Sequence, residues 1–178
     1  QVINTLLPKI SLLNKQKIIF EDDDGTSVHE FDDFRAAVSD LVESLWSTLG
    51  NDKLTKVLIT GVGKNCYSAE NAATVDVFEI EAMAFLLNTL LRDMTLSESP
   101  WVCDIIDSSK FFVKNILMLL QTGYETAAET AAAKVLKLDF IRTSTTLLGT
   151  LAGYFQISDS HLNICIGALF HGLERTTI

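Results

Sequence analysis

The chain has 178 residues, of which 48% are hydrophobic and 21% are charged, and this composition excludes an intrinsically disordered protein. Its net charge of −9 argues against direct nucleic-acid binding, because a phosphate backbone needs clustered Lys and Arg. No apolar run approaches the roughly 20 residues that span a bilayer, so we expect no membrane partner.

The chain opens on a helical pattern and then becomes acidic. Apolar residues recur at helical spacing over residues 2–13, where Pro8 is expected to weaken or kink the helix. Residues 1–20 are interpreted as the end of one repeat, and residues 21–29 as an acidic loop. Because the chain lacks an initial Met and already shows a helical pattern there, we expect it to be a piece of a longer protein.

The clearest predicted helix follows the acidic loop. Apolar residues recur at intervals of three and four from Phe31 to Leu49, and Gly50 stands where a helix C-cap would place it. A second helix from residue 53 completes a pair over about residues 30–66. The stripe predicts burial between neighbouring helices for Phe34, Val38, Leu41, Leu45 and Trp46.

The rest of the chain also has helical spacing. Further helices are predicted over residues 75–94, from Pro100 to about residue 120, over residues 139–155, and over a last segment to about residue 173. Ser97 or Ser99, and later Ser158 or Ser160, are candidate N-caps. Gly123 is expected to end a helix, and the alanine-rich residues 125–135 to form a short helix or a helical linker.

Helix follows helix with short turns, which predicts an all-α fold. Two-helix units of roughly 40–47 residues are typical of HEAT and armadillo arrays. We therefore predict one array of HEAT repeats, a superhelix of antiparallel helix pairs, over residues 1–178. The pairs are expected at about residues 30–66, 74–120 and 138–173. A globular helical bundle would give almost the same pattern.

One segment suggests a different class of protein. Between Lys56 and Lys64 an apolar run leads into Gly61 and Gly63, as a strand enters a nucleotide or sugar-phosphate loop. The P-loop motif fails, because Asn65 follows Lys64 and the first glycine is missing. The alternative is a small α/β enzyme around this segment. The interpretation that we favour is a helix loosened by its two glycines, with no phosphate role for Lys64.

No catalytic, metal or cofactor site is predicted. The acidic run around Gly25 lacks the terminal Asp and Glu of an EF-hand. His161 and Cys165 lie four residues apart, but no second ligand pair accompanies them, so packing is the better interpretation. Glu79 and Glu81 are expected on different helix faces. The three cysteines are far apart and odd in number, which predicts reduced thiols.

An acidic cluster is the candidate partner-binding site. It holds 7 of the 23 acidic residues, and no Lys or Arg interrupts positions 18–34. It can be a solvated loop followed by acids in the favourable first turn of the next helix, or a contact for a basic partner. The members of the cluster are Glu21, Asp22, Asp23, Asp24, Glu30, Asp32 and Asp33.

Three segments, in order, resemble helices of importin-β-type nuclear transport receptors, especially of the transportin-SR branch. Residues 30–42 (EFDDFRAAVSDLV) are similar to the pattern E-F-x-x-F-R-x-x-V-S-D-L-[VL]. Residues 77–85 resemble W-x-x-x-E-A-x-x-F, with Phe78 in place of the usual Trp and one position closer to Glu81. Residues 142–149 (RTSTTLLG) resemble [RY]-T-S-[IL]-x-L-[LIV]-G, and residues 159–173 fit the partner helix.

This resemblance implies a HEAT-repeat superhelix that is not an enzyme and that shuttles between nucleus and cytoplasm. Its implied partners are protein cargo, the GTPase Ran and, through the full-length parent, nucleoporins. A basic cargo would suit the acidic cluster. The Arg-rich cargo helix of the transportin-SR branch is not supported, because Arg35, Arg92, Arg142 and Arg175 are widely dispersed. A helical-repeat adaptor outside nuclear transport shares the same predicted fold.

Overall fold

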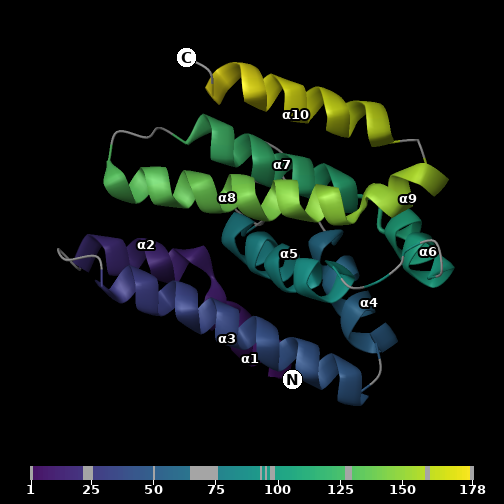
Figure 1. Ribbon diagram of the computed structural model, residues 1–178, viewed down its shortest axis with the longest axis horizontal. Coiled ribbons are helices and arrows are strands. Elements are labelled where there is room, and N and C mark those ends of the chain that lie inside the picture. Colours follow the sequence, from purple (N-terminus) through teal and green to yellow (C-terminus); the bar gives the residue numbers. More distant parts are fainter. Residues whose placement is uncertain are drawn as a thin grey trace.

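The computed structural model describes residues 2–21, 26–49, 51–64, 76–92, 94, 96, 99–126, 130–158 and 161–176. In chain order the helices are α1 (Val2–Ile10), α2 (Leu12–Glu21), α3 (Thr26–Leu49), α4 (Asn51–Val62), α5 (Val77–Arg92), α6 (Pro100–Ser108), α7 (Phe112–Glu125), α8 (Ala131–Thr150), α9 (Ala152–Ile157) and α10 (Leu162–Thr176). Figure 1 shows them stacked, with α10 at one end, then α7 and α8, then α5 and α2, and with α1 and α3 at the other end.

This arrangement confirms the predicted all-α array. The most extensive contacts join α7 with α8, α5 with α8, and α4 with α5. The α/β alternative is wrong, because Lys56 lies within α4, Gly61 in its last turn, and the described residues contain no β-strand. None of the described helices is long and apolar enough to cross a membrane. The division into pairs at residues 30–66, 74–120 and 138–173 stays a prediction, since each helix in a stack contacts several neighbours.

Residues 2–13 do not form one helix, because the chain bends at Ser11 between α1 and α2. Pro8 lies inside α1, and the carbonyl groups at the end of a helix need partners outside it. Asn14 supplies them: its Nδ2 donates to the carbonyl oxygens of Pro8 at 2.6 Å and of Lys9 at 3.2 Å. The Ser11 hydroxyl accepts from the backbone N–H of Leu13 at 3.3 Å. Side chains of the bend therefore fix the angle between α1 and α2.

Helix α3 begins at Thr26, five residues before the expected start near Phe31. The acidic loop predicted over residues 21–29 is therefore wrong at both ends: Glu21 closes α2, and residues 26–29 already belong to α3. Asp32 and Asp33 consequently lie beyond the first turn of α3, which contains no acidic residue. They cannot stabilise the free amides of the helix start in the way that the sequence suggested.

The buried face of α3 differs from the predicted one. Burial is confirmed for Val38, but Phe34 is 40% exposed and Leu41 is 48% exposed, so the prediction for these two residues is wrong. Leu45 and Trp46 are half-buried. The buried positions are spaced by four and three residues, and one of them is charged: Phe31, Arg35, Val38 and Val42. A stripe counted from apolar residues alone omits Arg35 and so selects a face turned away from the true contact.

Helix α5 lies at the centre of the stack and is buried on almost every side. It contacts α1, α2, α3, α4, α7 and α8. A helix that is apolar around its whole circumference is stable only when neighbours cover it from all directions. Its buried residues are Ile80, Glu81, Ala82, Met83, Ala84, Leu86, Leu87, Thr89, Leu90 and Leu91.

The glycines after Lys56 allow close packing and do not loosen α4. A Cβ on Gly61 would collide with the sulfur of Met83 in α5, and one on Gly63 would lie 2.7 Å from the Cβ of Ser109. Asn115 of α7 is buried, and its Nδ2 donates to the carbonyl oxygen of Val62 at 2.6 Å, which satisfies the end of α4. The Gly-x-Gly segment is therefore a packing site between α4 and its neighbours.

The segment predicted as one helix from Pro100 to about residue 120 is two helices. Pro100 is the first residue of α6, as expected, although the side chain of Ser99 makes no capping bond. A turn over residues 109–111 separates α6 from α7. Gly123 lies inside α7 and does not end it. The glycine allows α7 and α8 to pack closely, because a Cβ there would stand 2.7 Å from Ile141 of α8.

The last three helices also depart from the predicted bounds. Helix α8 begins at Ala131, with the Thr130 hydroxyl accepting from the backbone N–H of Ala133 at 3.1 Å. The end of the alanine-rich stretch therefore belongs to α8. The helix predicted to run on to residue 155 is divided at Leu151 into α8 and α9. Helix α10 then extends to Thr176.

Candidate functional site

The described part of the acidic cluster lies on α3. Asp22, Asp23 and Asp24 fall outside the described residues, as does the side chain of Glu21. Glu30 and Asp33 are exposed, and no described residue forms an ion pair with either. They present two negative charges to solvent on the first half of α3.

Asp32 is the member of the cluster that the structure engages internally. Its Oδ1 lies 2.6 Å from Nζ of Lys15, a residue of α2 that is only 2% exposed. The same ammonium lies 2.9 Å from Oδ2 of Asp139 on α8, without the geometry of a directed hydrogen bond. Two carboxylates thus share one buried lysine, which joins α2, α3 and α8. Such burial is tolerated only because the cation is paired.

A second buried polar group lies further along the same helices. Nη2 of Arg35 is 2.8 Å from Oε1 of Glu81, and the Thr143 hydroxyl donates to the same oxygen at 2.7 Å. The guanidinium also stands over the ring of Phe85, 4.0 Å from its centroid. This cluster, which we name the Arg35–Glu81–Thr143 cluster, ties α3, α5 and α8 together.

The carboxyl group of Glu81 is completely buried. Its burial raises the pKa above the ordinary value near 4.5, while the charge and hydrogen bond of Arg35 and the hydroxyl of Thr143 oppose the rise. Its second oxygen, Oε2, has no hydrogen-bond partner among the described residues. The cluster is therefore a costly polar site that specifies how three helices meet.

Sequence reasoning did not assign Glu81 a role, yet the signal was present. Arg35 belongs to the first family-like segment, Glu81 and Phe85 to the second, and Thr143 to the third. The three family-like segments thus each contribute side chains to one buried cluster. Which side chains of distant segments meet is a tertiary property, and spacing within one helix does not contain it.

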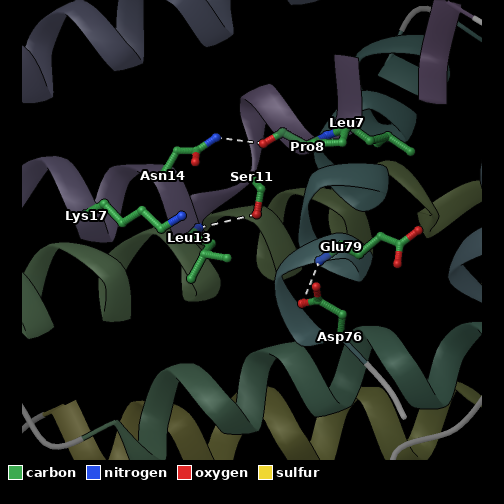
Figure 2. Close-up of a pocket in the computed structure, with 8 residues that line it drawn as sticks. All are labelled: Leu7, Pro8, Ser11, Leu13, Asn14, Lys17, Asp76 and Glu79. Atoms are coloured by element: carbon green, nitrogen blue, oxygen red, sulfur yellow. Dashed lines mark hydrogen bonds between the residues drawn. The ribbon is translucent and has the colours of Figure 1, made fainter. Parts of the chain in front are cut away.

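A surface pocket lies where the bend between α1 and α2 faces the start of α5. Its volume is about 460 Å³. Figure 2 shows Lys17 from α2 and the carboxylates of Asp76 and Glu79 at its edges. Its other lining residues are Leu7, Pro8, Ser11, Leu13 and Asn14.

The two carboxylates of this pocket, Asp76 and Glu79, differ in their interactions. Asp76 caps α5, because its Oδ1 accepts from the backbone N–H groups of Phe78 at 2.9 Å and Glu79 at 3.2 Å. Glu79 is exposed, and no described residue pairs with it. The lining of the pocket combines apolar, polar and charged side chains, and Glu79 is accessible to a basic side chain of a partner.

His161 and Cys165, the pair considered as metal ligands, differ in exposure, because His161 is half-buried and Cys165 is buried. Cys165 is buried, and burial raises the pKa of its thiol to about 11, which disfavours the thiolate that a metal would need. Cys103 is also a free, buried thiol, and Cys66 lies outside the described residues. Within the described ranges, no group of three His, Cys, Asp or Glu residues could hold a metal ion.

Comparison with known protein families identifies a family that covers this chain. A family described as the importin beta-like KAP122 middle domain matches residues 1–178, the whole chain. No curated protein matches the chain significantly. The match covers all three family-like segments and the buried cluster that they form.

Proposed function

The chain belongs to the importin beta-like KAP122 middle domain family, and on that premise we propose that this part of a nuclear transport receptor binds protein cargo through its acidic surface. Importin-β-like karyopherins are not enzymes, and we propose no cofactor. The match supports a karyopherin without specifying the transportin-SR branch, so the proposal does not assume the cargo of that branch.

The observation that carries the cargo proposal is the set of exposed carboxylates that form no ion pair with any residue the structure describes. Glu30 and Asp33 lie on α3, and Glu79 lies at the pocket between α1, α2 and α5. Asp22, Asp23 and Asp24 add charge in the chain before α3. Asp32 contributes less, because Lys15 already neutralises it in part. Such a surface suits a basic segment of cargo and would raise its association rate more than its final affinity.

The regulation that we propose follows from the same class of receptor. Ran in its GTP state would shift the helical array between cargo-bound and cargo-free arrangements, which requires different affinities for the two. Shuttling between nucleus and cytoplasm, with nucleoporin contacts made by the full-length receptor, completes the proposal. The rival, a helical adaptor outside nuclear transport, predicts no response to Ran.

A charge-matched comparison in the full-length receptor tests the cargo surface. The variant Glu30→Gln/Asp33→Asn removes two exposed charges, and the variant Asp22→Asn/Asp23→Ser/Asp24→Asn removes three charges from the chain before α3. The charge-matched control for the first variant is Asp52→Asn/Asp104→Asn, which alters two exposed acids on α4 and α6. Association with a basic cargo peptide should slow for the first two variants, most strongly at low salt, where screening is weakest. Equal association rates for variants and control at every ionic strength would contradict the cargo proposal and would mean that these carboxylates are only solvated.

The second test addresses the receptor class. A pulldown with the full-length receptor should recover cargo without Ran and lose or gain it when Ran locked in its GTP state is added. Cargo recovery that does not change with Ran would favour the adaptor. The two tests are independent, because a receptor regulated by Ran can still bind its cargo at another surface.

A further inference from the structure

A groove runs between α7 and α10, on a part of the surface that the acidic cluster does not reach. Two cavities of about 360 and 320 Å³ lie along it, and both are lined by Leu117 of α7 and Ile164 of α10. Ile164 is 59% exposed, although it is an apolar residue of a helix whose residues 162–173 carry no acidic or basic residue except His171. The groove is thus an apolar channel shared by two helices, which lie beside each other in Figure 1.

The two ends of the groove differ in charge. One cavity is bordered by Lys110, Lys114 and His161, the other by Gln121, Glu125 and His171. Both lysines are exposed, in a chain that has only 14 Lys and Arg residues. The lysine end also contains Asp107, but its Oδ1 accepts a hydrogen bond from Tyr154 at 2.6 Å and so faces α9.

At the opposite end of the groove, the carboxylate of Glu125 is hydrogen-bonded within its own helix. Oε1 of Glu125 accepts from Nε2 of Gln121 at 2.7 Å within α7. The groove therefore carries a net positive end and a negative end, with apolar residues between them. Complementarity with this pattern requires a ligand with an apolar centre and acidic residues at the end that meets Lys110 and Lys114.

The side chains and helices that line the groove indicate which secondary structure a bound ligand would have. An extended segment would lay unpaired N–H and C=O groups against side chains of α7 and α10, whose own backbone groups are paired within helices. A helix satisfies its backbone internally and offers one apolar face. On α7 the lining residues run from Val113 to Leu117 in one cavity and from Leu117 to Glu125 in the other. The middles of these two runs are about six residues apart, which is roughly 9 Å or nearly two helical turns.

We propose that the α7–α10 groove is a docking site for an acidic amphipathic helix of a protein partner. Apolar residues two turns apart would fill the two cavities, and acidic residues in one terminal turn would meet Lys110 and Lys114. This partner is opposite in charge to the basic cargo. The inference therefore goes beyond the proposed function, and neither depends on the other.

Fluorescence anisotropy with the full-length receptor tests this proposal. The probe is a fluorescein-labelled helical peptide of about 18 residues, with leucines two turns apart and glutamates in its first turn. The charge variant is Lys110→Glu/Lys114→Glu, and its matched control is Lys53→Glu/Lys56→Glu, which reverses two exposed lysines on α4. The apolar variant is Ile164→Asp, matched by Val57→Asp, since Val57 is 55% exposed.

The probe should bind saturably, and both groove variants should weaken it at least about tenfold while both controls leave it unchanged. A peptide with lysines in place of the glutamates should bind as weakly as the charge variant. Because all substituted residues are exposed or at the surface, circular dichroism should show unchanged helix content. Absence of saturable binding, equal loss in variants and controls, or equal binding of a proline-interrupted peptide would each overturn the proposal.

Discussion

Removing Arg35 tests whether the Arg35–Glu81–Thr143 cluster organises the fold. We choose Arg35→Met, because the methionine keeps a long side chain against Phe85 and deletes only the charge and the hydrogen-bond donors. Glu81 would then be a completely buried carboxylate that retains only Thr143 as a donor. Breaking one side of a buried ion pair costs about 3–5 kcal/mol, and this is the expected loss of unfolding free energy at neutral to basic pH.

The loss should depend on pH in a defined direction. The pKa of Glu81 is already raised by burial, and Arg35 is the main group that lowers it, so the substitution raises this pKa further. Below the wild-type pKa, Glu81 is protonated in both folded proteins and the cost of the substitution is smallest. Between the two pKa values the folded variant binds a proton that the wild type does not, so the cost increases by about 1.4 kcal/mol per pH unit.

Urea denaturation followed by circular dichroism, at pH values from about 4 to about 9, measures this cost. The control is Arg92→Met, whose partner Glu43 lies 3.6 Å away and whose side chain is 61% exposed. An exposed pair is worth less than about 1 kcal/mol, and its removal should show no comparable pH dependence between pH 5 and 9. If Arg35→Met costs as little as Arg92→Met, or if its cost is constant with pH, the buried cluster does not act as described.

Three further predictions concern packing and the Gly-x-Gly segment. Val42→Ala should lower the unfolding free energy by about 2–3 kcal/mol, because Val42 is fully buried. Leu41→Ala should lower it by less than about 1 kcal/mol, because Leu41 is 48% exposed. Equal losses of unfolding free energy in chemical denaturation would mean that the buried face of α3 is misassigned. Gly123→Ala should destabilise the folded protein by about 1–3 kcal/mol, because the added Cβ collides with Ile141. Gly149→Ala should stabilise it by about 0.5–1 kcal/mol, because no atom lies within 4 Å of the added Cβ in α8. Melting temperatures that shift in the same direction for both variants would contradict this prediction. Calorimetry with ATP, GTP and sugar phosphates should show no saturable heat, and a signal that Lys64→Ala abolishes would contradict the packing role of this segment.

The acidic cluster shows how far a charge pattern alone can lead. Its composition correctly drew attention to α3, where Glu30 and Asp33 are exposed. The pattern could not reveal that Lys15 of α2 partly neutralises Asp32, nor that Asp139 of α8 shares the same lysine. Nor could it locate the pocket at Glu79, because this pocket exists only where the bend between α1 and α2 faces α5.

The sequence by itself determined that this chain is a stack of helices, because apolar spacing at three and four residues is a local property of each segment. It also contained the three family-like segments that match the importin beta-like family. Only the tertiary structure decided which face of each helix is buried. In α3 the charged Arg35 occupies a core position because Glu81 of α5 and Phe85 receive it there. In α7, Gly123 is a contact point and not a helix breaker, because backbone atoms of α8 would lie 3.1–3.2 Å from an added Cβ. In α4, Gly61 leaves room for the sulfur of Met83. Pairings of this kind depend on residues far apart in the chain, and no local pattern encodes them.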